Sequence, residues 1–209
     1  MPLSLPIRLL KSKKTEARAL ITVVSGLPRS GTSMMMRMLE TGGLPVLTDR
    51  QRTPDENNPR GYYEFERVKQ LRAGDYAWLP EANGKAVKII SALLEHLPPH
   101  FTYRVIFMQR DLDEVVASQR KMLDRMGEDH GPAGDEKMKA LFREHLLKVE
   151  AWLAQQPFLS TLYINYNDLL QEPSGQVERV GDFLGRELET EKMARVVDRN
   201  LYRERRQAV

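Results

Sequence analysis

One stretch decides the fold expected for this chain: Val23-Val24-Ser25-Gly26-Leu27-Pro28-Arg29-Ser30-Gly31-Thr32-Ser33. It begins with apolar, β-branched residues, turns through glycine and proline, and continues into a helical pattern from Thr32. A buried strand that turns sharply into a helix presents backbone N–H groups to one anion, and this geometry binds phosphate. We therefore expect a phosphate-binding loop in an α/β fold.

The loop has the glycine spacing of a nucleotide-binding loop but lacks its lysine. Four residues separate Gly26 from Gly31, and Thr32 stands where a nucleoside triphosphatase carries lysine. Within the turn, Arg29 is the residue that carries a positive charge. The loop is therefore expected to bind a phosphate group that is not the end of a triphosphate.

The composition is that of an ordinary globular protein with a small excess of positive charge. The chain has 209 residues, of which 41% are hydrophobic and 29% charged, and its formal net charge is +3. A charge this small suits an anionic ligand but does not indicate nucleic-acid binding. The sequence has no cysteine, which excludes disulfides, zinc thiolate sites and thiol catalysis.

The length predicts a single domain over residues 1–209. Within it we expect an N-terminal arm at 1–18 and a basic tail at 195–209. In the arm an apolar patch precedes the lysines, which is the reverse of the order in a signal peptide. No apolar run has the length of a membrane span, so a cytoplasmic protein is expected.

Short apolar segments alternate with helical segments along the chain. We expect strands at residues 19–25, 86–90, 103–108 and 159–165, and helices at 32–40, 112–126, 136–155 and 175–184. A long polar loop is expected at 48–61 and a flexible connection at 127–135. This order predicts a central parallel sheet flanked by helices, a three-layer α/β/α fold of the P-loop NTPase-like class.

A second candidate anion site follows the strand expected at 103–108. Arg110 stands at the strand end, where a triphosphatase would hold magnesium with a carboxylate, and Ser118 lies two turns into the next helix. A guanidinium fork and a hydroxyl suit a phosphate group. Together with the loop, this site predicts a ligand with two separated phosphates and no bound metal.

These segments resemble those of the sulfotransferases that use 3′-phosphoadenosine 5′-phosphosulfate (PAPS). Residues 28–33 are similar to the family's 5′-phosphosulfate loop, and residues 105–118 are similar to its 3′-phosphate strand and helix. Further similarity is found at residues 58–64, 166–170 and 183–185. The family's carboxy-terminal Arg-Lys-Gly-x-x-Gly segment is absent, and arginines without its glycines, such as Arg203, occur nearby.

The resemblance implies transfer of a sulfonate from PAPS to a hydroxyl or amine, with the nucleotide PAP as product. The implied donor-binding residues are Pro28, Arg29, Ser30, Gly31, Thr32, Ser33, Arg110, Ser118 and Arg203. Arg29 and the loop N–H groups would stabilise the charge that develops on the 5′-phosphate. The implied partner is a small-molecule, glycan or lipid acceptor, with no nucleic acid and no membrane span.

An acceptor must lose its proton as it attacks, so a general base is expected. Glu64 is our candidate, because it follows the long loop and would enter the cleft opposite the phosphate loop. Glu66 and Asp49 are the alternates, and Lys88 is expected to neutralise charge on the sulfonate.

Two other functions are kept as alternatives. A P-loop nucleotide kinase or triphosphatase would share the loop spacing, although the lysine and the magnesium-binding aspartate of that class are missing. A non-catalytic nucleotide-binding protein would keep the fold and the nucleotide but catalyse no transfer.

Overall fold

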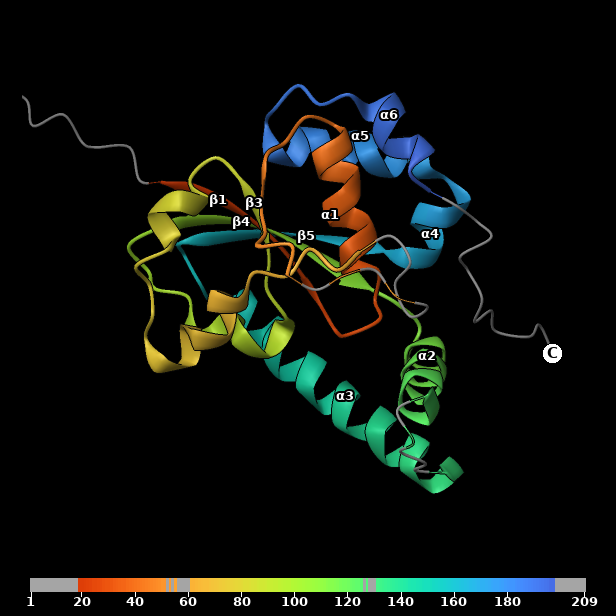
Figure 1. Cartoon of the computed structure of the whole chain (residues 1–209). Helices are drawn as coiled ribbons and strands as arrows, with labels where there is room; N and C mark the ends of the chain where they lie inside the picture. The colour runs from red at the N-terminus through yellow and green to blue at the C-terminus, as the bar shows by residue number, and fades with distance from the viewer. Residues whose placement is uncertain are drawn as a thin grey trace, which may run out of the picture.

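The computed structural model describes residues 19–51, 53, 55, 61–125, 127 and 131–197. Among these residues, five parallel strands form one sheet in the order β2-β3-β1-β4-β5 (Figure 1). The strands are β1 (Leu20–Gly26), β2 (Val46–Leu47), β3 (Ala86–Lys88), β4 (Thr102–Gln109) and β5 (Leu159–Asn165). The predicted parallel sheet is confirmed, with the two-residue strand β2 added at one edge.

Helices cover both faces of this sheet. The α-helices are α1 (Thr32–Thr41), α2 (Leu112–Arg125), α3 (Gly131–Leu153), α4 (Tyr166–Gln171), α5 (Pro173–Leu184) and α6 (Thr190–Arg195). The described residues also form the 3-10 helices η1 (Glu66–Ala73), η2 (Leu79–Ala82) and η3 (Ser91–His96). Helices α1, α5 and α6 lie on one face and α3 on the other, as the predicted three-layer fold requires (Figure 1).

Two apolar cores enclose the sheet, because its strands carry apolar side chains on both faces. On the α1 side the core includes Val24, Met35, Met36, Met38, Ile106, Met108 and Val177. On the α3 side it includes Val23, Trp78, Leu94, Val105, Phe107 and Leu153. The methionines of α1 thus fix this helix, and the loop that precedes it, against the sheet.

The strand order places the loop after β1 where ligands of open parallel sheets bind. Strand β1 is central, with β3 on one side and β4 on the other. The strands that follow β1 in the sequence thus lie on both sides of it: β2 and β3 on one side, β4 and β5 on the other. At such a switch point the loops beyond the carboxyl ends of the strands diverge and leave a binding crevice.

The structure corrects the prediction for residues 127–135, because α3 begins at Gly131 rather than near residue 136. The proline at position 132 is compatible with this start, since the first N–H groups of a helix need no partner within it. Asp135 also pairs with Arg120 of α2 at 2.6 Å, and Lys139 pairs with Asp113. Packing against α2 therefore extends the helix through a segment that was expected to be flexible.

Other differences concern the carboxy-terminal third of the chain. Helix α4 was not predicted; it is capped by Asn165, whose side-chain oxygen accepts from the amides of Asn167 (2.8 Å) and Asp168 (3.2 Å). Arg195, expected to open the basic tail, is instead the last residue of α6. The arm at 1–18 and residues 198–209 lie outside the described residues. Within the described part of the chain, no helix is both long and apolar enough to cross a membrane.

Trp78 packs against Phe65, the residue that follows the predicted base Glu64 in the sequence. Replacing Trp78 tests this packing. Its fully buried indole meets the ring of Phe65 edge-on, with centroids 5.5 Å apart. Trp78→Ala is expected to lower the free energy of unfolding by about 3–5 kcal/mol, because it leaves a large cavity. Trp78→Phe should cost clearly less, since the buried indole N–H has no hydrogen-bond partner among the described residues. Equal losses for the two variants in urea denaturation would contradict this assignment.

His145 should make stability depend on pH. Its Nε2 lies 2.8 Å from the hydroxyl oxygen of Ser91, which joins α3 to η3. Burial lowers the pKa of His145 below its ordinary value of 6.5; Lys148 adds to this effect and Glu95 opposes it. As the pH falls, His145 is therefore protonated at a higher pH in the unfolded chain than in the folded protein. Its contribution to the free energy of unfolding is complete above about pH 6.5 and is lost as the pH falls below this value. Denaturation between about pH 7 and 5 should show this loss, and His145→Gln should diminish it while His100→Gln does not.

Candidate active site

The loop after β1 takes its shape from two glycines. Gly26 has φ 146° and Gly31 has φ 96°, values that side chains rarely allow. A Cβ atom at Gly26 would lie 2.6 Å from the carbonyl oxygen of Met108, and one at Gly31 would overlap the ring of Tyr166. The spacing seen in the sequence is therefore a steric requirement of this turn.

The remaining loop residues close the turn and open α1. The buried Ser30 hydroxyl donates to the carbonyl of Leu27 at 2.7 Å, while Pro28 is exposed at the tip. Thr32 and Ser33 form the first positions of α1, and no described side chain caps this helix. The first amides of a helix lack partners within it, so an anion at this point would satisfy them.

Arg29, Arg110 and Ser118 meet beside the loop. Arg29 has φ 68°, a left-handed conformation that is uncommon for a residue with a side chain. Its Nε donates to the hydroxyl oxygen of Ser118 at 2.9 Å, and Nη1 of Arg110 donates to its carbonyl at 3.0 Å. The two predicted anion-binding segments therefore adjoin, and the Arg29 side chain points to the second segment.

Arg110 is held from three sides. Its Nε donates to Glu114 at 2.9 Å, and only 2% of the Glu114 side chain is exposed. The other carboxylate oxygen of Glu114 accepts from Asn167 at 3.2 Å. The Arg110 guanidinium also lies 4.5 Å from the centre of the Tyr166 ring. The sequence analysis did not identify Glu114 and Tyr166 as site residues; the four-residue spacing from Arg110 to Glu114 was a signal for the first, and the resemblance at residues 166–170 was a signal for the second.

The cluster concentrates positive charge in a partly buried place. Burial lowers the pKa of Arg29; Arg110 and Arg125 lower it further, while Tyr62 and Asp55 act in the opposite direction. A bound anion would relieve both the repulsion between the arginines and the loss of their hydration. The electrostatics therefore favour a phosphate-like ligand.

Lys88 connects the phosphate loop to Glu64. At the end of β3, its ammonium lies 3.4 Å from the hydroxyl oxygen of Ser33 and 3.7 Å from a carboxylate oxygen of Glu64. It also donates to the carbonyl of Tyr62, which accepts from Ser33 at 3.2 Å. Only 9% of the Lys88 side chain and 27% of the Glu64 side chain are exposed. Lys88 thus lies between the phosphate loop and Glu64, the carboxylate predicted as the base.

The segment that carries Glu64 is fixed by contacts with α1 and with Thr48. Tyr63 has φ 55°, and its hydroxyl donates to Glu40 of α1 at 2.6 Å. Glu40 also accepts from Arg50 at 2.9 Å. The carbonyl of Glu64 accepts from the Thr48 hydroxyl at 2.8 Å. A strained residue next to a carboxylate at the sheet edge is typical of functional sites, where surrounding contacts maintain the strain.

The other predicted residues have different surroundings. Asp49 accepts from the amide of Glu66 at 2.6 Å and so fixes the start of η1. The Glu66 carboxylate pairs with Lys69 at 2.7 Å on the surface. Arg203 lies outside the described residues. No group of three or more side chains suited to hold a metal ion occurs among the described residues.

Comparison with solved structures finds sulfotransferases with the same fold. STF1 from Mycobacterium tuberculosis is 18% identical, with 87% of this chain and 71% of that chain covered and a TM-score of 0.58. Mouse SULT7A1, complexed with PAP, is 15% identical, with 87% and 63% covered and a TM-score of 0.56. The sulfotransferase domain of the Synechococcus PCC 7002 olefin synthase is 17% identical, with 92% and 86% covered and a TM-score of 0.53. Comparison with curated proteins gives no match.

The sequence itself matches a family model over nearly its whole length. The model of the sulfotransferase domain matches residues 21–207. This span includes the loop after β1, the Arg29–Arg110–Ser118 cluster and the Lys88–Glu64 pair. The chain therefore belongs to the sulfotransferase domain family.

Proposed function

We propose that the protein transfers a sulfonate from PAPS to a hydroxyl or amine of an acceptor. The observation that carries this proposal is that hydrogen bonds join Arg29, Arg110 and Ser118 in one cluster beside the loop after β1. It supports a site for a nucleotide with two phosphates, such as the PAP bound by the mouse relative. Family membership supports the reaction type.

The donor would lie along the carboxyl ends of β1 and β4. The first amides of α1, with the hydroxyls of Thr32 and Ser33, would hold its 5′-phosphate. Arg110 and Ser118 would hold the 3′-phosphate. Arg29 was expected at the 5′-phosphate, but its side chain donates to Ser118, so we propose that it also contacts the 3′-phosphate. Pro28, Ser30 and Gly31 would contribute to donor binding by keeping the turn in the conformation that directs its backbone N–H groups to the phosphate. Arg203 stays a proposed contact from the tail.

The reaction is an in-line displacement at sulfur. The acceptor oxygen or nitrogen forms a bond to sulfur, while the bond from sulfur to the bridging oxygen of the 5′-phosphate breaks. The electron pair of that bond leaves with PAP, and the acceptor proton passes to Glu64. Lys88, beside both Ser33 and Glu64, would stabilise the negative charge that develops around the transferred group.

The kinase or triphosphatase alternative has less support. Thr32 occupies the place of the lysine that would reach the β- and γ-phosphates. Arg110, at the end of β4, occupies the region where that class holds magnesium with a carboxylate. An arginine there favours a second phosphate instead of a metal ion.

Arg29→Ala tests the donor site without removing the buried ion pair of Arg110. We expect PAP to bind roughly 10–100-fold more weakly, because a charge-assisted hydrogen bond to the 3′-phosphate is lost. Binding of 5′-AMP, which lacks that phosphate, should change far less. Calorimetric titration measures both, and Arg186→Ala is the matched control because this exposed arginine contacts Gly84 instead. Undiminished PAP binding by Arg29→Ala would refute the assignment.

Glu64→Gln tests the proposed base. With proton transfer lost, kcat should fall by about 10²–10⁴-fold while PAP affinity stays close to that of the unmodified protein. Release of PAP from PAPS over a panel of phenols, sugars and amines measures the rate. Glu66→Gln is the control, since that carboxylate pairs with Lys69. Equal effects of the two substitutions would exclude Glu64 as the base, and PAP binding without any turnover would favour the non-catalytic alternative.

A further inference from the structure

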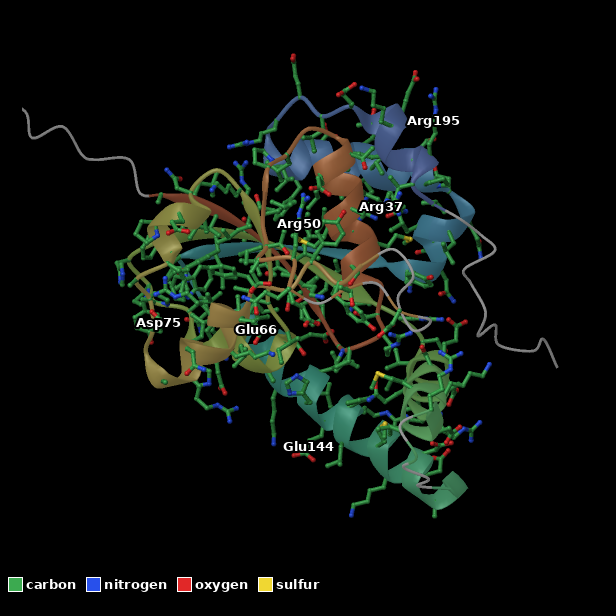
Figure 2. All side chains as sticks on the ribbon, in the orientation of Figure 1. Arg37, Arg50, Glu66, Asp75, Glu144 and Arg195 are labelled. Carbon is green, nitrogen blue, oxygen red and sulfur yellow. The ribbon has the colours of Figure 1, made fainter. Side chains whose placement is uncertain are left out.

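A second concentration of positive charge lies in a groove between α1 and α6, which we call the α1–α6 groove. It is lined by Arg37, Thr41, Lys192, Arg195 and Val196 and has a volume of about 360 Å³. Three of these residues are cations and none is an acid. Figure 2 shows two of them, Arg37 on α1 and Arg195 on α6. None of the lining residues belongs to the phosphate loop, the Arg29–Arg110–Ser118 cluster or the Lys88–Glu64 pair.

Arg37 is the cation that α1 contributes to the groove. It is partly buried, and it makes no hydrogen bond or ion pair within the part of the chain that the structure describes. The acid one turn further along α1, Glu40, already accepts from Tyr63 and Arg50. Among the described residues, no carboxylate takes up the hydrogen-bond donors of this guanidinium. An anion in the groove would supply the missing partner.

The two cations of α6 are available to the same ligand. Lys192 pairs with Glu189, and Arg195 lies 3.5 Å from Glu191, but all four side chains are more than half exposed. Exposed pairs of this kind contribute little and exchange readily for another anion. A ligand can therefore recruit both cations at small cost.

The position of α6 relative to α1 is fixed by close packing. Buried Met193 lies against Gly42, where a Cβ atom would come within 2.6 Å of the Met193 side chain. The amide of Glu189 donates to the carbonyl of Gly42 at 3.1 Å. The two helices that carry the cations are therefore fixed relative to each other, so no movement of the backbone is needed to bring the cations to one ligand.

We propose that the α1–α6 groove binds an oxyanion, namely a sulfate, phosphate or carboxylate group. Arg37 provides the fork that such a group prefers, and Lys192 and Arg195 complete the positive surroundings. Arg37 follows Thr32 by five residues, about 7.5 Å along the helix axis, so this cation of the groove lies less than two turns from the start of α1. The anion is either free or part of a larger molecule, such as an acceptor that reaches from the groove to the site of transfer.

Calorimetric titration of the full chain with PAP already saturating tests this site apart from the nucleotide loop. The probes are inorganic sulfate and phenyl phosphate. We expect saturable binding of one probe molecule per chain, weakened by added sodium chloride. Arg37→Gln should weaken it at least about fivefold, by loss of a charge-assisted contact, and Arg186→Gln should leave it unchanged. Tighter binding of phenyl phosphate would assign the anion to a larger molecule, and equal binding would assign it to a free ion.

Two results would overturn the proposal. The first is that neither sulfate nor phenyl phosphate binds saturably; the second is that Arg37→Gln binds the probe with the same affinity as the unmodified chain. If Arg37→Gln does not fold, Arg195→Gln gives the same test from the other helix. PAP affinity, measured on each sample, should be unaffected by either substitution. Should PAP not bind at all, the titrations are repeated without it in the Arg29→Ala chain, so the groove is judged separately from the proposed transfer reaction.

Discussion

The hydrogen bond from Arg110 to the carbonyl of Arg29 joins the loop after β1 to the end of β4, and the geometry of the whole site depends on this junction. It holds the loop in the conformation that turns the Arg29 side chain toward Ser118. Arg110 can serve in this way because buried Glu114 balances its charge. Removing that carboxylate would leave a buried, uncompensated cation, which is far more costly than the pair itself.

The same edge of the sheet also brings the predicted base to the loop. Lys88, at the end of β3, contacts Ser33 on one side and Glu64 on the other, so three strands contribute to one site. The segment before Glu64 is held in a strained conformation at Tyr63 by its bond to Glu40 of α1. Helix α1 thus supports both halves of the site: its first turn follows the loop proposed to hold the donor phosphate, and its last turn holds the segment that carries Glu64.

Much of the fold was predictable because local patterns determine it. Apolar runs specified four of the five strands, and Gly26 and Gly31 specified the turn because no other residue fits there. The contacts of Tyr166 with Gly31 and Arg110 were not predictable, since they join segments far apart in the sequence. The early start of α3 was missed for a similar reason, because packing against α2 overrides local preferences near Gly131.

The central claim is that the loop and the arginine cluster form one site for a nucleotide with two phosphates. The most direct test compares the affinities of the unmodified chain for PAP, 5′-AMP and ATP by calorimetric titration. The account predicts that PAP binds roughly 10–100-fold more tightly than 5′-AMP, since the 3′-phosphate adds charge-assisted hydrogen bonds, and that ATP gains nothing from its β- and γ-phosphates. Equal affinities for PAP and 5′-AMP, or a preference for ATP, would contradict it.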